Sequence, residues 1–178
     1  MTFPELLAEH KLNIIESWVA RTMGTYAAEG AKFFTNQKDQ FANPVGFNAK
    51  KGLEKLFKVL AEGTEIEQLP SELMQFIKIR AVQDMTPARA LGFLLELKGI
   101  VRDACTVEKL VETVNEWIKF EVAIDKAALL AFNLYMEDRE LIYKVKVNEY
   151  KRGTHILAER GVQCPSAMMR QEEKGSKK

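Results

Sequence analysis

Cysteine and histidine are both scarce in this chain of 178 residues: its cysteines are Cys105 and Cys164, and its histidines are His10 and His155. Two cysteines form no disulfide framework, and with no secretory signal in view we expect a cytoplasmic protein. The scarcity also argues against zinc, because these four side chains lack the spacing of a zinc-binding set. We therefore expect no bound metal.

Other residues typical of cofactor sites and active sites are missing as well. A haem globin needs an axial ligand, commonly histidine, on a helix beside the pocket, whereas His10 lies near the start of the chain and His155 near its end. The Glu-x-x-His pairs of di-iron bundles, the Gly-x-x-x-x-Gly-Lys loop and the Gly-x-Ser-x-Gly elbow do not occur. We expect a protein that holds no cofactor and is not an enzyme.

The chain has little excess charge of either sign and no long hydrophobic run. Its 26 Lys and Arg residues face 25 Asp and Glu residues, a net charge of +1 at pH 7, which disfavours a broad surface for nucleic acid. The longest uncharged stretches fall well short of the roughly 20 residues that a membrane span needs. We expect neither a nucleic-acid partner nor membrane insertion.

Helix start and stop signals recur along the chain and predict an all-α fold. Prolines stand just inside the expected helix starts, where the missing N–H costs little. The periodicity of apolar residues predicts helices over about 2–26, 43–63, 70–82, 86–104 and 106–152. The segment Tyr143–Val147 alternates like a strand, but no second strand is there to pair with it. We expect one domain of five to seven helices over residues 1–152, globin-like or bundle-like, and a flexible, mostly disordered tail of low apolar content over 153–178.

No glycine or proline occurs from Thr106 to Arg152, which predicts one long C-terminal helix. Residues 127–136 carry no charge on any side, and a helix that is apolar all round is expected to be buried. Beyond them, at about 100° per residue, apolar side chains fall on two opposite faces. One face holds Leu134, Leu141 and Val145 together with the polar Asn148, and the other holds Met136, Tyr143, Val147 and Tyr150. We expect the first face to pack on the domain and the second, the predicted contact face, to bind a partner protein or a second copy.

Polar residues in apolar surroundings form another group of candidates. Arg80, Gln83 and Asp84 precede the break at Thr86, and Arg80 and Asp84 can pair along one helix face. One interpretation makes Arg80 a grip for an anionic ligand. The other, which we favour because buried charges are usually paired, makes the group a pinned corner between helices. Asn133, in the uncharged run, is expected to fix helix register or to mark a ligand cavity.

Several ordered blocks of the sequence resemble the RsbRD N-terminal domain family, over roughly residues 5–152. They are Phe41–Gly46, Ile79–Asp84, Ala90–Phe93 and the closing pair Ala131–Met136 and Arg139–Tyr143, followed by Val147–Glu149. That family comprises the amino-terminal sensory domains of stress-signalling proteins, the RsbT co-antagonists of the stressosome. The resemblance implies a helical, globin-like, haem-free domain that forms dimers. In longer relatives a STAS domain follows, so we expect either a stand-alone homologue or a chain whose downstream domain is missing.

By this resemblance the chain is a signal-sensing or adaptor domain of bacterial stress or regulatory signalling. We expect a ligand or partner protein to shift the packing around Asn133, and the long helix to pass that shift to a dimer mate or client. The alternative is a small-molecule carrier or a degenerate, haem-free globin-like protein that acts with a metabolic or redox complex. That alternative predicts an enclosed cavity near Trp18, Phe93, Trp117 and Phe132.

Overall fold

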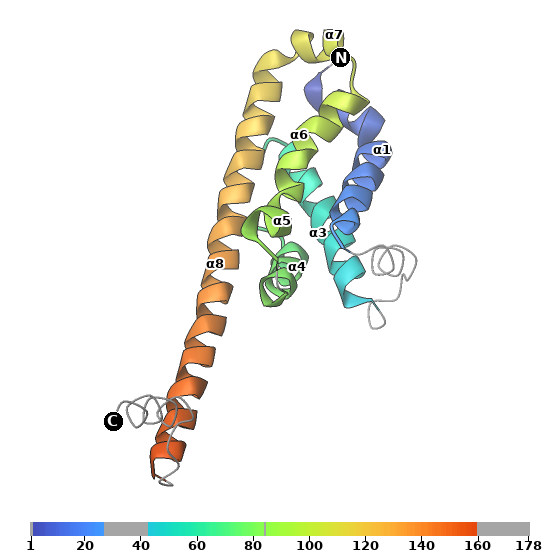
Figure 1. Cartoon of the computed structure of the whole chain (residues 1–178). Coiled ribbons are helices and arrows are strands. Elements are labelled where there is room, and N and C mark those ends of the chain that lie inside the picture. The colour runs from blue at the N-terminus through green and yellow to red at the C-terminus, as the bar shows by residue number, and fades with distance from the viewer. Residues whose placement is uncertain (1, 27–42, 84, 160–178) are drawn as a thin grey trace, which may run out of the picture. The chain divides into compact units, whose positions relative to one another are not determined.

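The computed structural model describes residues 2–26, 43–83 and 85–159, and within them it contains seven helices and no strand (Figure 1). The helices are α1 (Phe3–Gly24), α3 (Pro44–Ala61), α4 (Ser71–Val82), α5 (Pro87–Leu91), α6 (Phe93–Ala104), α7 (Val107–Glu112) and α8 (Val114–Glu159). The predicted all-α fold with a long C-terminal helix is confirmed. Tertiary contacts divide the chain into residues 1–138, here called the helical domain, and residues 139–178, here called the C-terminal segment. Each is described by itself.

The first two helices begin at the capping residues that the sequence indicates. Thr2 Oγ1 accepts the backbone N–H of Glu5 at 3.4 Å, and the Glu5 carboxylate accepts the Thr2 backbone N–H at 2.9 Å. This reciprocal pair is a capping box, and its bond to the Thr2 N–H lowers the pKa of Glu5. At the start of α3, Asn43 Oδ1 accepts the Gly46 N–H at 2.8 Å, with Pro44 at the first helical position. The Asn43–Pro44 pair therefore has a structural role.

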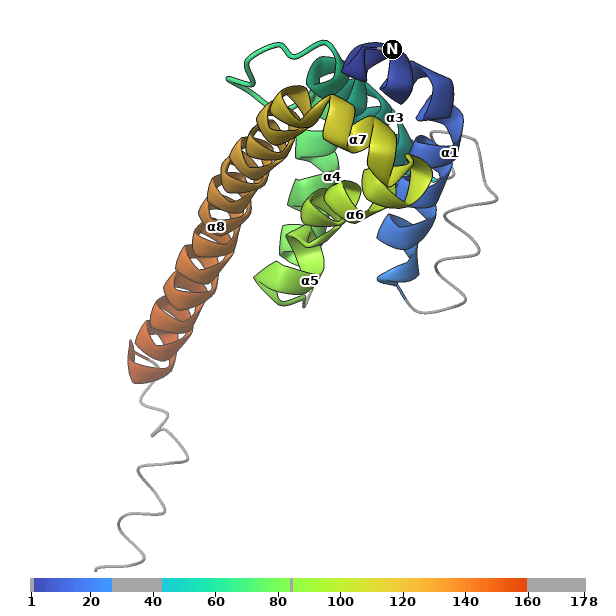
Figure 2. The ribbon, with the colours of Figure 1, turned by 90° about the horizontal axis from the view of Figure 1, so that it is seen from above.

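Within the helical domain, α1 packs against α3 and α6, and α4 packs against α3 (Figures 1 and 2). The contact between α3 and α4 is very close at Gly52. A Cβ added to Gly52 would lie 2.6 Å from the backbone nitrogen of Leu73. Only glycine permits this approach, because real Cβ atoms do not come so near to backbone atoms.

Aromatic side chains join the helices of the core. Trp18 of α1 is fully buried, and its Nε1 donates to the Phe93 carbonyl at the start of α6 at 2.6 Å. Phe3 packs edge-on against Phe120 and Trp117 of α8, with ring centroids 5.4 and 6.1 Å apart. These contacts hold the first part of α8 against the N-terminal helix.

Two of the predicted helices are each divided in the structure. The helix predicted over 86–104 consists of α5 and α6, which meet at Gly92. The long predicted helix is interrupted at Thr113, between α7 and α8, where φ is −115° and ψ is 29°. The Thr113 hydroxyl donates to the Lys109 carbonyl at 3.0 Å, a local bond that competes with regular helical bonding. Neither break involves proline.

The middle of α8 is not buried on every side, which corrects the expectation drawn from its uncharged run. Ala127, Ala131 and Tyr135 face the core, whereas Leu129 is 66 % exposed and Phe132 is 46 % exposed. The expectation failed because absence of charge does not require burial, and much of any protein surface is apolar.

In the C-terminal segment the helix continues past Arg152, its predicted end, to Glu159. Residues 143–147 are helical and not extended. Leu141 and Val145 of one predicted face are exposed, and so are Tyr143, Val147 and Tyr150 of the opposite face. The prediction that the first face packs on the domain is therefore wrong for Leu141 and Val145, whereas Leu134 packs partly against the core. From residue 160 on, the predicted tail lies outside the described residues.

Candidate functional site

Arg80 is completely buried where α1, α4 and α5 meet in the helical domain. Its guanidinium carbon lies 4.4 Å from the ring centroid of Phe76, 5.1 Å from that of Phe93 and 5.0 Å from that of Tyr26. Aromatic ring faces attract a cation at these distances. Burial lowers the pKa of the guanidinium, but an arginine stays charged in proteins. The corner therefore holds a permanent buried charge.

The hydrogen bonds of Arg80 go to neutral oxygen atoms. Nη2 donates to the Thr22 carbonyl at 2.9 Å and to the Thr25 hydroxyl at 2.7 Å. Nη1 donates to the Ala90 carbonyl at 2.8 Å, and Nε donates to the Tyr26 hydroxyl at 3.3 Å. The two carbonyls belong to the last turns of α1 and α5, where the helix dipole is negative. The C-terminal ends of two helices therefore stabilise the charge of Arg80.

These contacts favour the interpretation of Arg80 as a pin between helices, because its donors are already engaged. Asp84, its predicted partner, lies outside the described residues. Gln83 comes directly after α4, and its Oε1 is buried without a hydrogen-bond partner among the described residues. A role of Arg80, Gln83 and Asp84 in holding a ligand stays a prediction.

Asn133 lies exposed on α8, so the prediction that it is a polar residue of the core is wrong. The polar contact between this part of α8 and the domain is made by Tyr135. Tyr135 is 1 % exposed, and its hydroxyl donates to the Met85 carbonyl at 2.8 Å. The signal that sequence reasoning missed is the four-residue spacing of Ala127, Ala131 and Tyr135, which marks the buried side of the helix.

Tyr135→Phe is expected to lower the free energy of unfolding by about 1 kcal/mol, because the Met85 carbonyl loses its donor while the ring packing is retained. Urea denaturation followed by circular dichroism measures the change. Tyr143→Phe, on the exposed C-terminal segment, is the control and is expected to change stability by less than about 0.5 kcal/mol. Equal effects of the two substitutions would contradict the role given to Tyr135.

A surface hollow of about 170 Å³ lies between the start of α1, the end of α3 and the first part of α8. Phe3 and Phe120 contribute to its apolar walls, and Lys119 is also among its lining residues. Its walls include Phe3 and Phe120, which pack against Trp117, but not Trp18, Phe93 or Phe132, the other residues near which a carrier protein was expected to have its cavity. Of these, Trp18 and Phe93 are joined directly by a hydrogen bond.

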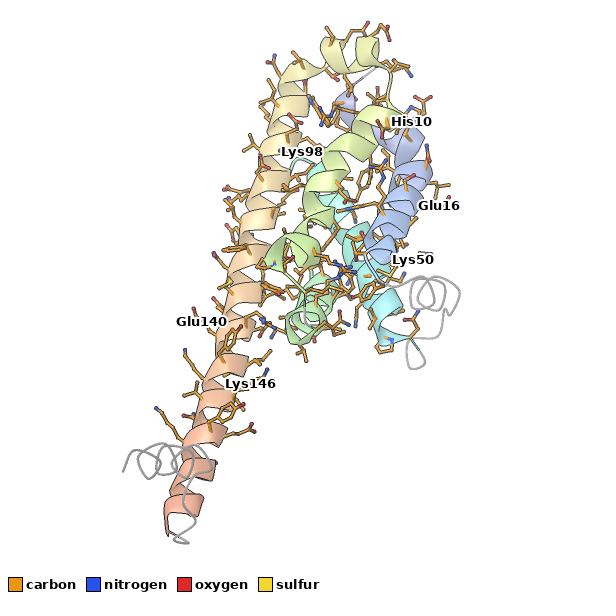
Figure 3. The ribbon with its side chains drawn as sticks, in the orientation of Figure 1. His10, Glu16, Lys50, Lys98, Glu140 and Lys146 are labelled. Carbon is orange, nitrogen blue, oxygen red and sulfur yellow. The ribbon has the colours of Figure 1, made fainter. Side chains whose placement is uncertain are left out.

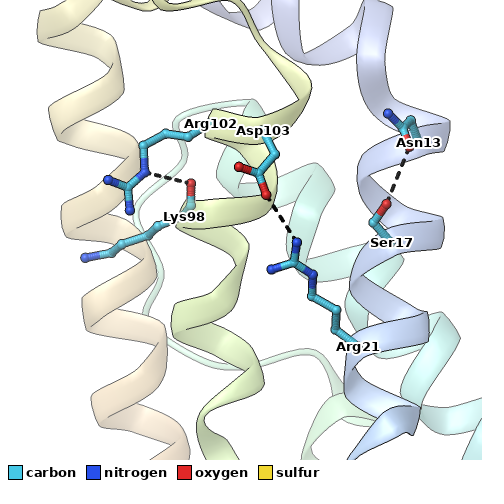
Figure 4. Close-up of polar contacts among 6 residues, drawn as sticks. All are labelled: Asn13, Ser17, Arg21, Lys98, Arg102 and Asp103. Atoms are coloured by element: carbon cyan, nitrogen blue, oxygen red, sulfur yellow. Dashed lines mark hydrogen bonds and ion pairs between the residues drawn. The ribbon is translucent and has the colours of Figure 1, made fainter.

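A smaller hollow, of about 80 Å³, lies between α1 and α6 and is polar (Figure 4). Arg21 Nη2 is 3.1 Å from Asp103 Oδ2 across it, and the Ser17 hydroxyl donates to Asn13 Oδ1 at 3.4 Å. About half or more of each charged side chain is exposed, and exposed ion pairs of this kind contribute little. This hollow is a solvated polar contact between two helices.

Neither cysteine chemistry nor metal binding finds support in the described part of the chain. Cys105 is a buried free thiol after α6, and burial raises its pKa, which makes it a poor nucleophile. Within residues 2–26, 43–83 and 85–159, no group of three or more His, Cys, Asp or Glu side chains is placed to hold a metal ion.

Five exposed large apolar side chains of the helical domain lie on α8, whereas four others, Leu12, Val82, Leu95 and Val111, lie on other helices. Those on α8 are Val114, Ile118, Val122, Leu129 and Phe132, each between 45 and 66 % exposed. At about 100° per residue they lie on one side of the helix, roughly 120° from the side that faces the core. These five residues are called the α8 stripe below. Sequence reasoning missed its second part, Leu129 and Phe132, because the uncharged run was expected to be buried, and it did not consider the exposed side of the helix before residue 127.

The predicted contact face continues the spacing of the α8 stripe. Val122, Leu129, Met136, Tyr143 and Tyr150 recur at every seventh residue, the repeat of helices that pair side by side. Met136 packs partly against the core of the helical domain.

In the C-terminal segment the other members of the predicted contact face are exposed: Tyr143, Val147 and Tyr150. The guanidinium of Arg139 lies over the ring of Tyr143, 5.3 Å from its centroid. Charged residues lie between the apolar ones, and Glu140 and Lys146 are labelled in Figure 3. Apolar and charged side chains therefore both meet solvent along this segment.

Comparison with known families gives one result. The model of the family described as "RsbT co-antagonist protein rsbRD N-terminal domain" matches residues 13–148, from within α1 to within α8. No curated protein and no solved structure matches the chain. In the described part of the chain, no helix is long and apolar enough to cross a membrane.

Proposed function

Since the chain belongs to the RsbT co-antagonist rsbRD N-terminal domain family, we propose that it is a non-enzymatic sensory domain that passes a signal through α8 to a protein partner. Membership of the family makes it a stressosome-related signalling domain, and it suggests protein–protein interaction. The buried thiol of Cys105 and the fully engaged guanidinium of Arg80 support a role without catalysis.

The α8 stripe is the observation that carries this proposal. Exposed contiguous apolar surface usually marks a site of interaction, and the five stripe residues share one side of one helix. Their continuation at seven-residue intervals is the pattern of a helix that pairs with another helix. We propose that two copies form a homodimer through the α8 stripe, and that the predicted contact face extends the contact.

The relay requires that α8 can occupy two packings against the helical domain. The Tyr135–Met85 hydrogen bond and the contacts of Phe3 with Phe120 and Trp117 hold it in the packing described. A ligand or partner that binds one packing more tightly than the other shifts the population toward that packing. The size of this shift is limited by the ratio of its affinities for the two packings. The shift is then passed along α8 to the dimer mate or client.

Leu129→Glu is expected to convert the dimer into a monomer, because the dimer would have to bury a carboxylate in an apolar contact. Sedimentation velocity on the full chain over a range of concentrations measures the change. Leu12→Glu is the matched control, since Leu12 is 77 % exposed and belongs to α1, outside the α8 stripe. A wild-type chain that stays monomeric, or a Leu129→Glu dimer as tight as the wild type, would refute the proposed contact.

A further inference from the structure

One charged pair interrupts the α8 stripe, and the inference drawn from it rests on the proposed pairing through that stripe. Asp125 lies seven residues after Ile118 and seven before Phe132. At about 100° per residue this places Asp125 on the same side of α8 as its two apolar neighbours in the series. A carboxylate thus stands where the repeat would otherwise have an apolar side chain.

Lys98 of α6 holds this carboxylate from within the same helical domain. Its Nζ lies 2.8 Å from Asp125 Oδ1 and 2.9 Å from Oδ2. The Lys98 side chain is 21 % exposed and that of Asp125 52 %, and Figures 3 and 4 place Lys98 on the part of α6 that lies beside α8. The carboxylate is therefore neutralised before any partner arrives, although it still meets solvent.

We propose that the Lys98–Asp125 pair is a polar layer that aligns two copies in a parallel, in-register dimer. A residue beside a two-fold axis meets its own copy, so in this alignment the two charged pairs meet each other. In a shifted alignment Asp125 instead lies against apolar residues such as Val122 or Leu129, and loses water without gaining a polar partner. A single polar residue in an apolar helix seam sets register in this way, at a cost in stability.

The charges at the edges of the α8 stripe favour the same alignment. Glu121 lies at one edge and Lys126 at the other, five residues later. In a parallel, in-register pair of helices, a residue at one edge of the first helix lies opposite the residue five positions later at the other edge of the second helix. Glu121 of each copy then faces Lys126 of the other, whereas antiparallel pairing brings edges of like charge together. Lys126 Nζ lies 2.6 Å from Glu65 Oε1 in one copy, and both side chains are exposed, so that bond is free to exchange.

A double-mutant cycle on the full chain tests the polar layer by sedimentation equilibrium. Lys98→Met leaves the Asp125 carboxylate unpaired in the contact and is expected to weaken dimerisation at least about tenfold. Asp125→Leu completes the apolar series and is expected to tighten association. The double variant Lys98→Met/Asp125→Leu is expected to associate at least as tightly as the wild type, and Lys98→Arg to retain wild-type association.

Alignment is read separately, from the distance between spin labels attached to Asn133→Cys in a chain whose two native cysteines are replaced by serine. The wild-type stripe is expected to give one narrow, short distance, and Asp125→Leu a broad distribution. If Leu129→Glu abolishes the dimer while Lys98→Met changes neither association nor the distance, the polar layer is refuted and the proposed function stands. A dimer whose spin labels lie far apart also refutes the polar layer. A wild-type chain that is monomeric refutes both the polar layer and the proposed homodimer.

Discussion

Arg80→Met is expected to lower the free energy of unfolding of the helical domain by at least about 2 kcal/mol, because two buried carbonyls lose their donors at a cost of about 1–3 kcal/mol each. The methionine side chain is apolar, flexible and roughly as long as the aliphatic part of arginine, so the main change is the loss of the guanidinium N–H groups. The carbonyls of Thr22 and Ala90 then lose their donors at a place that water does not reach. Urea denaturation of the wild type and the variant measures the difference.

Arg89→Met is the matched control for this experiment. Arg89 also donates to the end of α1, from Nε and Nη2 to the Thr25 carbonyl at 3.2 and 2.7 Å, but its contacts are exposed. Its removal is expected to cost less than about 1 kcal/mol, because water can replace the lost donors. Equal costs at the two positions would show that Arg80 is not a structural pin. The grip for an anionic ligand would then be the better interpretation of that residue.

Gly52→Ala is expected to destabilise the domain by about 2 kcal/mol. The new Cβ would meet the Leu73 backbone nitrogen, Cα and Cβ at 2.6, 2.7 and 2.8 Å, so α3 and α4 must move apart. Overpacking of this kind costs about 1–3 kcal/mol, and the better helix propensity of alanine offsets about 1 kcal/mol at most. Thermal unfolding followed by circular dichroism gives the sign and size of the change.

Gly99→Ala in α6 provides a comparison of opposite sign. No heavy atom lies within 4 Å of the position that its Cβ would take. Alanine there is expected to stabilise the domain by up to about 1 kcal/mol, since only helix propensity changes. If both glycine substitutions shifted the melting temperature in the same direction, the close approach of α3 to α4 would not be what requires glycine at Gly52.

The helix starts were predictable because their causes are local. Thr2, Asn43 and Thr86 each cap a helix by accepting a backbone N–H three residues later, and a proline follows each of them within two residues. Such contacts depend on a few consecutive residues, so they can be recognised in the sequence. The interruption at Thr113 had no such signal, because a threonine hydroxyl that bonds to a preceding carbonyl is tolerated inside many helices.

The candidate site was only partly predictable, because its contacts join residues far apart in the chain. The sequence singled out Arg80, but its partners Thr22 and Ala90 lie on other helices. Asn133 was misjudged for a related reason. Which side of α8 is covered depends on where the domain packs, and the domain covers Tyr135 and leaves Asn133 exposed. Apolar periodicity shows that a helix has faces, but not which face stays open.

The position of Arg80 also has a consequence for how the helical domain loses structure. Helix ends ordinarily fray one turn at a time, independently of one another. Here a single guanidinium binds the last turns of both α1 and α5 from within α4. Neither end can unwind without leaving the buried cation short of acceptors, and the remaining bonds then hold it less well. The last turns of α1 and α5, together with the last turn of α4 that carries Arg80, are therefore expected to open as one cooperative unit and not as three separate fluctuations.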